Sequence, residues 1–189
     1  MQTDETRRGL LASAATLAAA SVLLPPEAEA ASARDIAERA RSALERLYRE
    51  QPHLRSLGER AKAILVFPQI VKAGLLVGGQ TGNGALLVNG SAAGYYNISA
   101  VSFGLQAGAQ AFSNALFFMS DAALEYLKSS NGWSIGSGPS IVVLDKGAAA
   151  SISSTTLTQD VYAVLFGQQG LMAGLGLEGS KITHIRPAE

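Results

Sequence analysis

The chain has 189 residues, no cysteine, and 15 basic and 15 acidic side chains that give a formal net charge of zero. The absence of cysteine excludes disulfide bonds, thiolate metal sites, a cysteine nucleophile and a lipid-modified cysteine. The balanced charge lacks the strongly basic face that tracking of nucleic-acid phosphates requires, so we expect no nucleic-acid partner.

Residues 1–30 have the pattern of an export signal. A pair of arginines precedes an apolar, alanine-rich run from Leu10 to Leu24, which is shorter than the about 20 residues of a membrane-spanning helix. Small residues before and at Ala30 fit cleavage by signal peptidase, and the arginine pair favours twin-arginine export. Residues 31–189 then form a single domain with 13 basic and 11 acidic side chains. We therefore predict a protein of the periplasm or cell envelope, peripheral to the membrane.

The first element predicted in this domain is an amphipathic helix over Ala33–Glu50. Apolar residues recur along it at helical spacing, and Ser32 is a suitable N-cap. Pro52 ends the helix, and a short helical segment is expected at Leu54–Lys62. Two interpretations of the long helix remain open: it packs on the domain with a solvated charged face, or its basic face contacts an anionic bilayer.

Charge is distributed unevenly along the domain. Residues 31–62 carry eight basic and five acidic side chains, whereas Lys72 is the only charged residue from Ala63 to Ser120. A stretch so poor in charge is either a deeply buried sheet or a surface that meets something apolar.

From Ala63 onwards the sequence predicts strands and glycine-rich turns. Ala63–Phe67 is an apolar run ended by Pro68, and it predicts a buried strand. Ile70–Val77 is ambiguous between a helical turn and a strand, and Gly78–Gly84 predicts a turn before a strand at Ala85–Asn89. Alternation with period two makes Tyr95–Ala111 the clearest strand signal.

The rest of the chain continues in short elements. A helix is expected at 121–128, capped by Ser120. Strands are expected at 114–119, 140–144, 148–156, 161–166, 171–177 and 182–185, with turns at 131–132 and 145–147. The predicted class is therefore α+β, with N-terminal helices packed on a strongly curved, mainly antiparallel, barrel-like β-sheet and one further helix near 121–128.

No pattern of catalytic or metal-binding residues is found. The glycines at 79–84 lack the dinucleotide-binding spacing and precede a strand-like segment. His53 and His184 lie outside any metal-binding spacing, no G-x-S-x-G elbow occurs, and the acidic residues are scattered. We therefore expect no enzymatic activity, no metal and no cofactor.

Three segments together resemble the SYLF-domain family. They are Ala63–Pro68 with Lys72–Gly74 and Gly78–Gly84, then Ser102–Gln110, and finally Gly170–Gly179. The last is similar to the G-L-F-A-G-x-x-L-E-G signature of the family, with Met172 in the place of the aromatic residue. The resemblance spans about Ala33 to Ile185.

The resemblance implies a non-enzymatic, membrane-lipid-binding module. Family members occur in bacterial envelopes, and eukaryotic relatives associate with anionic phosphoinositides through a basic amphipathic N-terminal segment, which Ala33–Glu50 could match. Actin binding is not expected of an exported protein.

We therefore expect a bacterial envelope protein that binds an anionic phospholipid membrane surface. The candidate lipid-binding residues are Arg34, Arg41, Arg46, Arg49, Lys62 and Lys72. Two alternatives remain: a structural or protein-interaction domain, self-association included, and a carrier of a small apolar ligand.

Overall fold

The computed structural model describes residues 31–74, 77–103, 108–144, 158–170, 177 and 179–189. The elements predicted at 145–147 and 148–156, like the signal at 1–30, lie outside the described residues, as does the strand predicted at 171–177 except for Leu177. The described helices are α1 (Ala33–Glu50), α2 (Leu54–Arg60) and α3 (Asp121–Ser129). The described strands are β1 (Ala63–Gly74), β2 (Val77–Val88), β3 (Ser91–Phe103), β4 (Gly108–Phe118), β5 (Trp133–Ser134), β6 (Ile141–Leu144), β7 (Val161–Gly170) and β8 (Lys181–Ile185).

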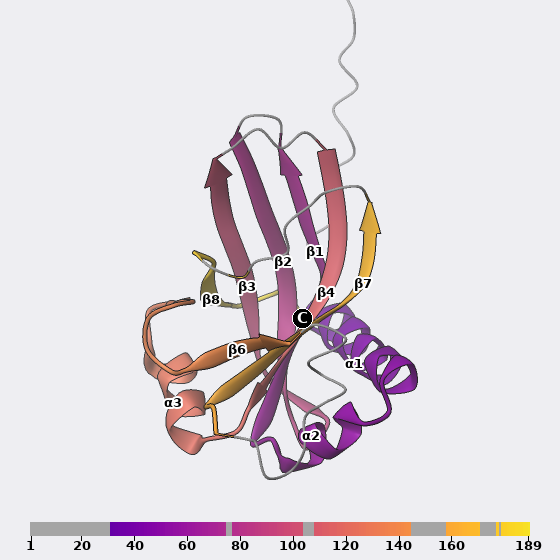
Figure 1. Cartoon of the computed structure of the whole chain (residues 1–189), viewed down its shortest axis with the longest axis vertical. Coiled ribbons are helices and arrows are strands. Elements are labelled where there is room, and N and C mark those ends of the chain that lie inside the picture. Colours follow the sequence, from indigo (N-terminus) through magenta and orange to yellow (C-terminus); the bar gives the residue numbers. More distant parts are fainter. Residues whose placement is uncertain (1–30, 75–76, 104–107, 145–157, 171–176, 178) are drawn as a thin grey trace, which may run out of the picture.

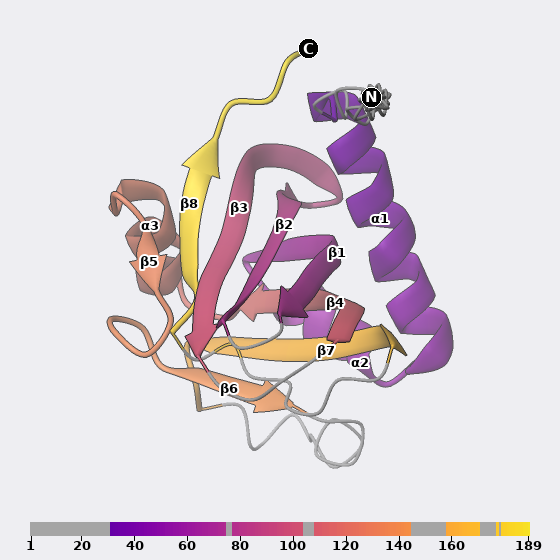
Figure 2. The ribbon, with the colours of Figure 1, turned by 90° about the horizontal axis from the view of Figure 1, so that it is seen from above.

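The strands form one sheet in the order β5-β8-β3-β2-β1-β4-β7-β6. Every described pairing is antiparallel except that of β6 with β7, which is parallel. The sheet curls into a half-barrel, with α1 against its outer face (Figures 1 and 2). The α+β prediction is confirmed, and the expected barrel is only half closed.

Helix α1 begins and ends where the sequence predicts. Ser32 and Asp35 form a capping box, in which the Asp35 amide donates to Ser32 Oγ over 3.2 Å and the Ser32 amide donates to the Asp35 carboxylate over 3.4 Å. Its apolar stripe is buried against the sheet and consists of Ile36, Ala37, Ala40, Ala43, Leu44, Leu47 and Tyr48. The helix is thus an integral part of the domain core.

Apolar side chains cover both faces of the central strands. In β1, Ile64 and Val66 face α1, whereas Leu65 and Phe67 face the inside of the half-barrel. The inner core also includes Trp133 and side chains from α3. Burial on both faces explains why β1 begins as a continuous apolar run instead of an alternating one.

The prediction of a turn at Gly78–Gly84 is wrong, because these residues are part of strand β2. Its residues pair with both β1 and β3. A Cβ on Gly84 would overlap the Val66 carbonyl oxygen and come within 2.6 Å of the Phe67 ring, and one on Gly82 would lie 2.5 Å from the Gln69 carbonyl oxygen. These glycines permit a close approach of neighbouring strands. The local sequence predicts a turn because glycine is also the residue most typical of turns.

Two further boundaries differ from the prediction. The alternating segment Tyr95–Ala111 contributes to two strands, because β3 ends at Phe103 and β4 begins at Gly108. Pro68 does not end β1, because the strand continues through a β-bulge, with one extra residue between Phe67 and Ile70. A bulge tolerates proline because the unpaired residue has no ladder hydrogen bond to lose.

Asp160 connects α3 to the start of β6 and β7. Its carboxylate accepts hydrogen bonds from Ser120 Oγ at 2.9 Å and from the Ser140 amide and Oγ at 3.1 and 2.9 Å. The hydrogen bonds from Ser120 and then Ser140 lower the pKa of Asp160 below its ordinary value of 3.8. Ser120 also caps α3, as predicted.

We expect Asp160→Asn to lower the free energy of unfolding by about 1 kcal/mol at neutral pH, a figure reduced for the solvent exposure of the carboxylate. Because the folded-state pKa is lowered, this contribution is present above the ordinary pKa and is lost as the pH falls through the folded-state value. Urea unfolding of both proteins between pH 7 and pH 2.5 should therefore show curves that converge at low pH. A constant difference across the range would contradict a role for the ionised carboxylate.

Candidate anionic-ligand site

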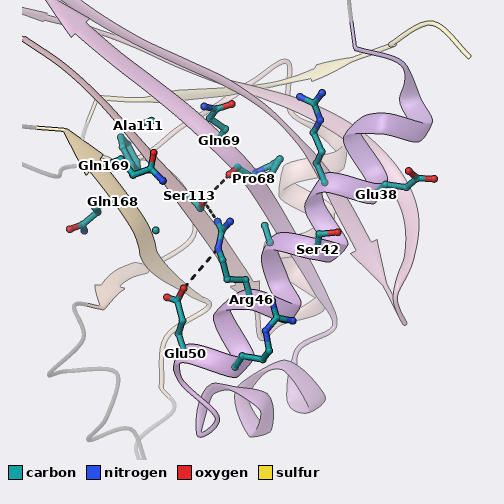
Figure 3. A pocket seen from close by; sticks show the side chains of 15 residues that line it. Glu38, Ser42, Arg46, Glu50, Pro68, Gln69, Ala111, Ser113, Gln168 and Gln169 are labelled. Atoms are coloured by element: carbon teal, nitrogen blue, oxygen red, sulfur yellow. Dashed lines mark hydrogen bonds and ion pairs between the residues drawn. The ribbon is translucent and has the colours of Figure 1, made fainter.

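A groove of about 880 Å³ lies along one flank of α1, between this helix and the outer face of the sheet (Figure 3). Helix α1 contributes one wall, and β1, β4 and β7 contribute the other. The principal lining residues are Glu38, Arg39, Ser42, Arg46, Arg49 and Glu50 from α1, and Pro68, Gln69, Ala111, Ser113 and Gly167–Gln169 from the sheet.

Strand irregularities shape the wall that faces α1. The register gives β1 one extra residue between Phe67 and Ile70 and gives β7 one between Phe166 and Gln169, on either side of β4. Gly167 lies in the bulge of β7 with φ of +62°, and a Cβ there would lie 3.1 Å from Arg46 Nη2. The two bulges bend the sheet beside the helix and leave room for an arginine side chain.

Arg46 occupies a fixed position in this groove. Its Nη2 donates to Ser113 Oγ over 2.9 Å, and Ser113 Oγ donates to the Pro68 carbonyl oxygen over 2.7 Å. The guanidinium also lies 5.5 Å from the centre of the Phe166 ring, within the range of cation–π attraction. These contacts hold the guanidinium before any ligand arrives.

The guanidinium of Arg46 keeps unused donor capacity. Its Nε is buried and has no hydrogen-bond partner among the described residues. Glu50 Oε1 lies 4.0 Å from that Nε, which is an ion-pair contact but too long for a hydrogen bond. A planar guanidinium with five donors can therefore still bind an oxyanion in a bidentate manner.

Two further arginines line the same groove. Arg39 and Arg49 are exposed, and they accompany Glu38 and Glu50, so the groove has three cations and two anions. Arg39 is absent from the residues predicted as candidates. It lies seven positions before Arg46, a spacing that places both on one flank of a helix and was the available signal.

The other predicted residues are dispersed. Arg34 is exposed near the start of α1, and Arg41 Nε donates to the Gly90 carbonyl oxygen over 2.9 Å. Lys62 forms an ion pair with Asp121 at 3.4 Å, whereas Lys72 lies in the outer half of β1. Of the six candidates, only Arg46 and Arg49 line this groove together.

A second hollow of about 320 Å³ lies beside α2. It is lined by two cations, Arg55 and the predicted residue Lys62, together with Glu45 and Glu59. Arg55 pairs with Glu45 at 3.4 Å and lies 4.8 Å from the centre of the Tyr48 ring, and Lys62 pairs with Asp121. Burial raises the pKa of Tyr48 from 10.0 to about 12. Since Arg55 and Lys62 are both paired with carboxylates at 3.4 Å, closer than the 4.0 Å contact of Arg46 with Glu50, this hollow is a weaker candidate for binding an anion.

Within the part of the chain that the structure describes, no three histidine, cysteine or acidic side chains come together as metal ligands. His53 precedes α2, and His184 in β8 packs edge-on against Tyr96 with ring centres 5.3 Å apart. Among the described helices, none combines the length and the apolar character needed to cross a membrane.

Comparison with known proteins identifies the family. Residues 99–188 match the family Ysc84, described as Las17-binding protein actin regulator. Residues 99–188 thus carry the match to the Ysc84, or SYLF, family that the sequence motifs predict. This is a family of lipid-binding and actin-regulator-related domains. No curated protein matches the chain significantly.

Proposed function

We propose that this chain is a non-enzymatic phospholipid-binding protein of the bacterial cell envelope. Its headgroup site is the groove that contains Arg39, Arg46 and Arg49. The observation that carries this proposal is the guanidinium of Arg46, which Ser113 and Phe166 hold in place while Nε lacks a hydrogen-bond partner.

The chemistry of the groove suits a phosphate group. Guanidinium is always charged and matches the spacing of phosphate oxygens, and an arginine already held in place loses less conformational entropy on binding. Arg39 and Arg49 can add charge at the rim. A headgroup phosphate would also displace the long contact between Arg46 and Glu50.

The packing of α1 limits how the protein can meet a bilayer. The apolar stripe of this helix is buried in the outer core, with Ala40 and Leu47 fully inaccessible. Insertion of that stripe into lipid would require the helix to leave the sheet. We therefore propose contact between folded protein and headgroups, mediated by the exposed arginine flank of α1.

The envelope location rests on the sequence of residues 1–30, with its arginine pair, apolar run and small residues at the cleavage position. An exported protein would meet the outer leaflet of the inner membrane or the inner leaflet of the outer membrane. An anionic phospholipid in either leaflet would suit a cationic groove.

Co-sedimentation with vesicles tests the proposal. We expect the purified protein to bind phosphatidylglycerol vesicles at 50 mM salt, to bind phosphatidylcholine vesicles at least tenfold more weakly, and to release from the former near 500 mM salt. Such salt sensitivity follows from screening of partly exposed charges. Equal binding to the two lipids, or no binding to phosphatidylglycerol at low salt, would exclude the groove as an anionic headgroup site.

A protein-interaction domain is the second candidate. The observation in its favour is strand β6 at one edge of the sheet, where Val143 is 42% exposed. A stable dimer in light scattering, combined with no vesicle binding, would favour this role. The carrier alternative has less support, because packed side chains of the inner core fill the concave face in the described residues.

A further inference from the structure

Strands β1–β4 continue beyond the region that α1 covers (Figure 1). The outer face of this extension has one row of paired positions formed by Ala109, Ala73, Gly79 and Val101 across the four strands. Val71 and Val77 lie on the same face, because residues two apart in a strand share a face. We call Val71, Ala73, Val77, Val101 and Ala109 the bare face.

The bare face is unusually apolar for an exposed surface. Val71, Val77 and Val101 are 44, 59 and 68% exposed, and they are three of the five large hydrophobic residues exposed among the described residues. The bare face contains no charged residue. Lys72, the only charge from Ala63 to Ser120, occupies the opposite face in register with Gln80 and Gln110.

The bare face begins where the arginine groove ends. Val71 pairs with Ala111 of β4, and Ala111 lines the groove beside Gln69. Cationic side chains on α1 therefore adjoin an uncharged, mainly apolar surface of the sheet, in which Thr81 and Ser99 are the polar residues beside Val71. A cationic groove followed by an apolar face matches the order of phosphate group and acyl chain in a bilayer interface.

We infer that the bare face enters the interfacial region of an anionic bilayer while the arginine groove holds a headgroup. The inference rests on the proposed function and specifies which surface accompanies that site. Anionic lipid is the occupant that the charges favour, since a second copy of the same face would leave the adjoining arginines facing each other across the contact.

The absence of native cysteine permits a direct test in the full chain, because a single cysteine can be labelled selectively. Val101→Cys carries an environment-sensitive nitrobenzoxadiazole dye at the most exposed valine of the bare face. Ala122→Cys, exposed on α3, is the matched control. On addition of phosphatidylglycerol vesicles we expect a blue shift and at least a twofold rise in emission for the first protein and no change for the second.

A second variant measures the contribution of the bare face without a dye. Val77→Thr combined with Val101→Thr keeps the β-branched shape but adds hydroxyl groups. We expect it to bind phosphatidylglycerol vesicles about three- to tenfold more weakly, with the same dependence on salt, because no charge is lost. Circular dichroism of the variant checks that the sheet remains folded.

The outcomes separate the two proposals. Vesicle binding without a dye response, and without an effect of the two threonines, would overturn the inference that the bare face enters the bilayer. The proposal of a headgroup site in the groove would still hold. No binding by the unmodified protein would overturn both. A dye response that rises with protein concentration in the absence of vesicles would assign the bare face to a second copy of the chain and thus overturn its assignment to lipid.

Discussion

Replacing Arg39, Arg46 and Arg49 together with glutamine is expected to weaken binding to phosphatidylglycerol vesicles by roughly 100-fold at low salt. Each basic side chain near an anionic surface contributes about 1 kcal/mol, and three such contributions correspond to a change of this size. The fixed position of Arg46 should make its share the largest. Co-sedimentation over a range of lipid concentrations measures the effect.

A charge-matched control distinguishes the groove from general electrostatic attraction. Arg34→Gln, Lys128→Gln and Arg186→Gln also remove three positive charges, at exposed positions outside the groove. We expect this control, measured at the same low salt, to lose less than tenfold in binding, because charges outside the groove act only through long-range attraction, which salt partly screens. Equal losses in the two triple variants would contradict a specific headgroup site.

Leu47→Ala is expected to lower the free energy of unfolding by about 2–5 kcal/mol. Leu47 has no exposed surface and lies in the outer core between α1 and the sheet. Truncation of such a residue loses its transfer free energy and leaves a cavity that the surroundings only partly fill. Since Leu47 has no exposed surface and packs against the sheet in the outer core, we expect the cost to fall in the upper half of that range.

Urea unfolding followed by circular dichroism measures this change, with Ser42→Ala as a control at an exposed position of the same helix. The control should alter stability by less than about 0.5 kcal/mol. A loss below about 1 kcal/mol for Leu47→Ala would mean that α1 detaches easily from the sheet. In that case the helix could reach a bilayer by its apolar stripe, and the mode of contact proposed above would be wrong.

The two interpretations of the long helix are compatible in the folded protein. Its apolar stripe packs on the sheet, which is the first interpretation, while the flank with Arg39 and Arg46 remains accessible at the groove. The same helix can therefore stabilise the domain and present cations. Only its burial pattern shows which of its faces is available to a ligand.

Local signals in the sequence determined the helices. The period of the apolar residues and the capping box at Ser32 predict α1 with its observed bounds, and Ser120 marks the start of α3. Both signals act within a few residues of each other, so they need no tertiary information. The α+β class follows from the same kind of local pattern.

The tertiary structure alone decided the glycine-rich strand and the arginine groove. The glycines at 78–84 allow the backbone of β1 to lie close to β2. A short stretch of sequence does not show which other strand lies next to it. Arg46, Ser113 and Gly167 lie far apart along the chain and meet because bulges in β1 and β7 bend the sheet beside α1. Bulges depend on cross-strand register, a long-range property, so the sequence does not show that Ser113 and Gly167 face Arg46 across a groove. The spacing of Arg39, Arg46 and Arg49 along one helix, by contrast, is a local property of the sequence.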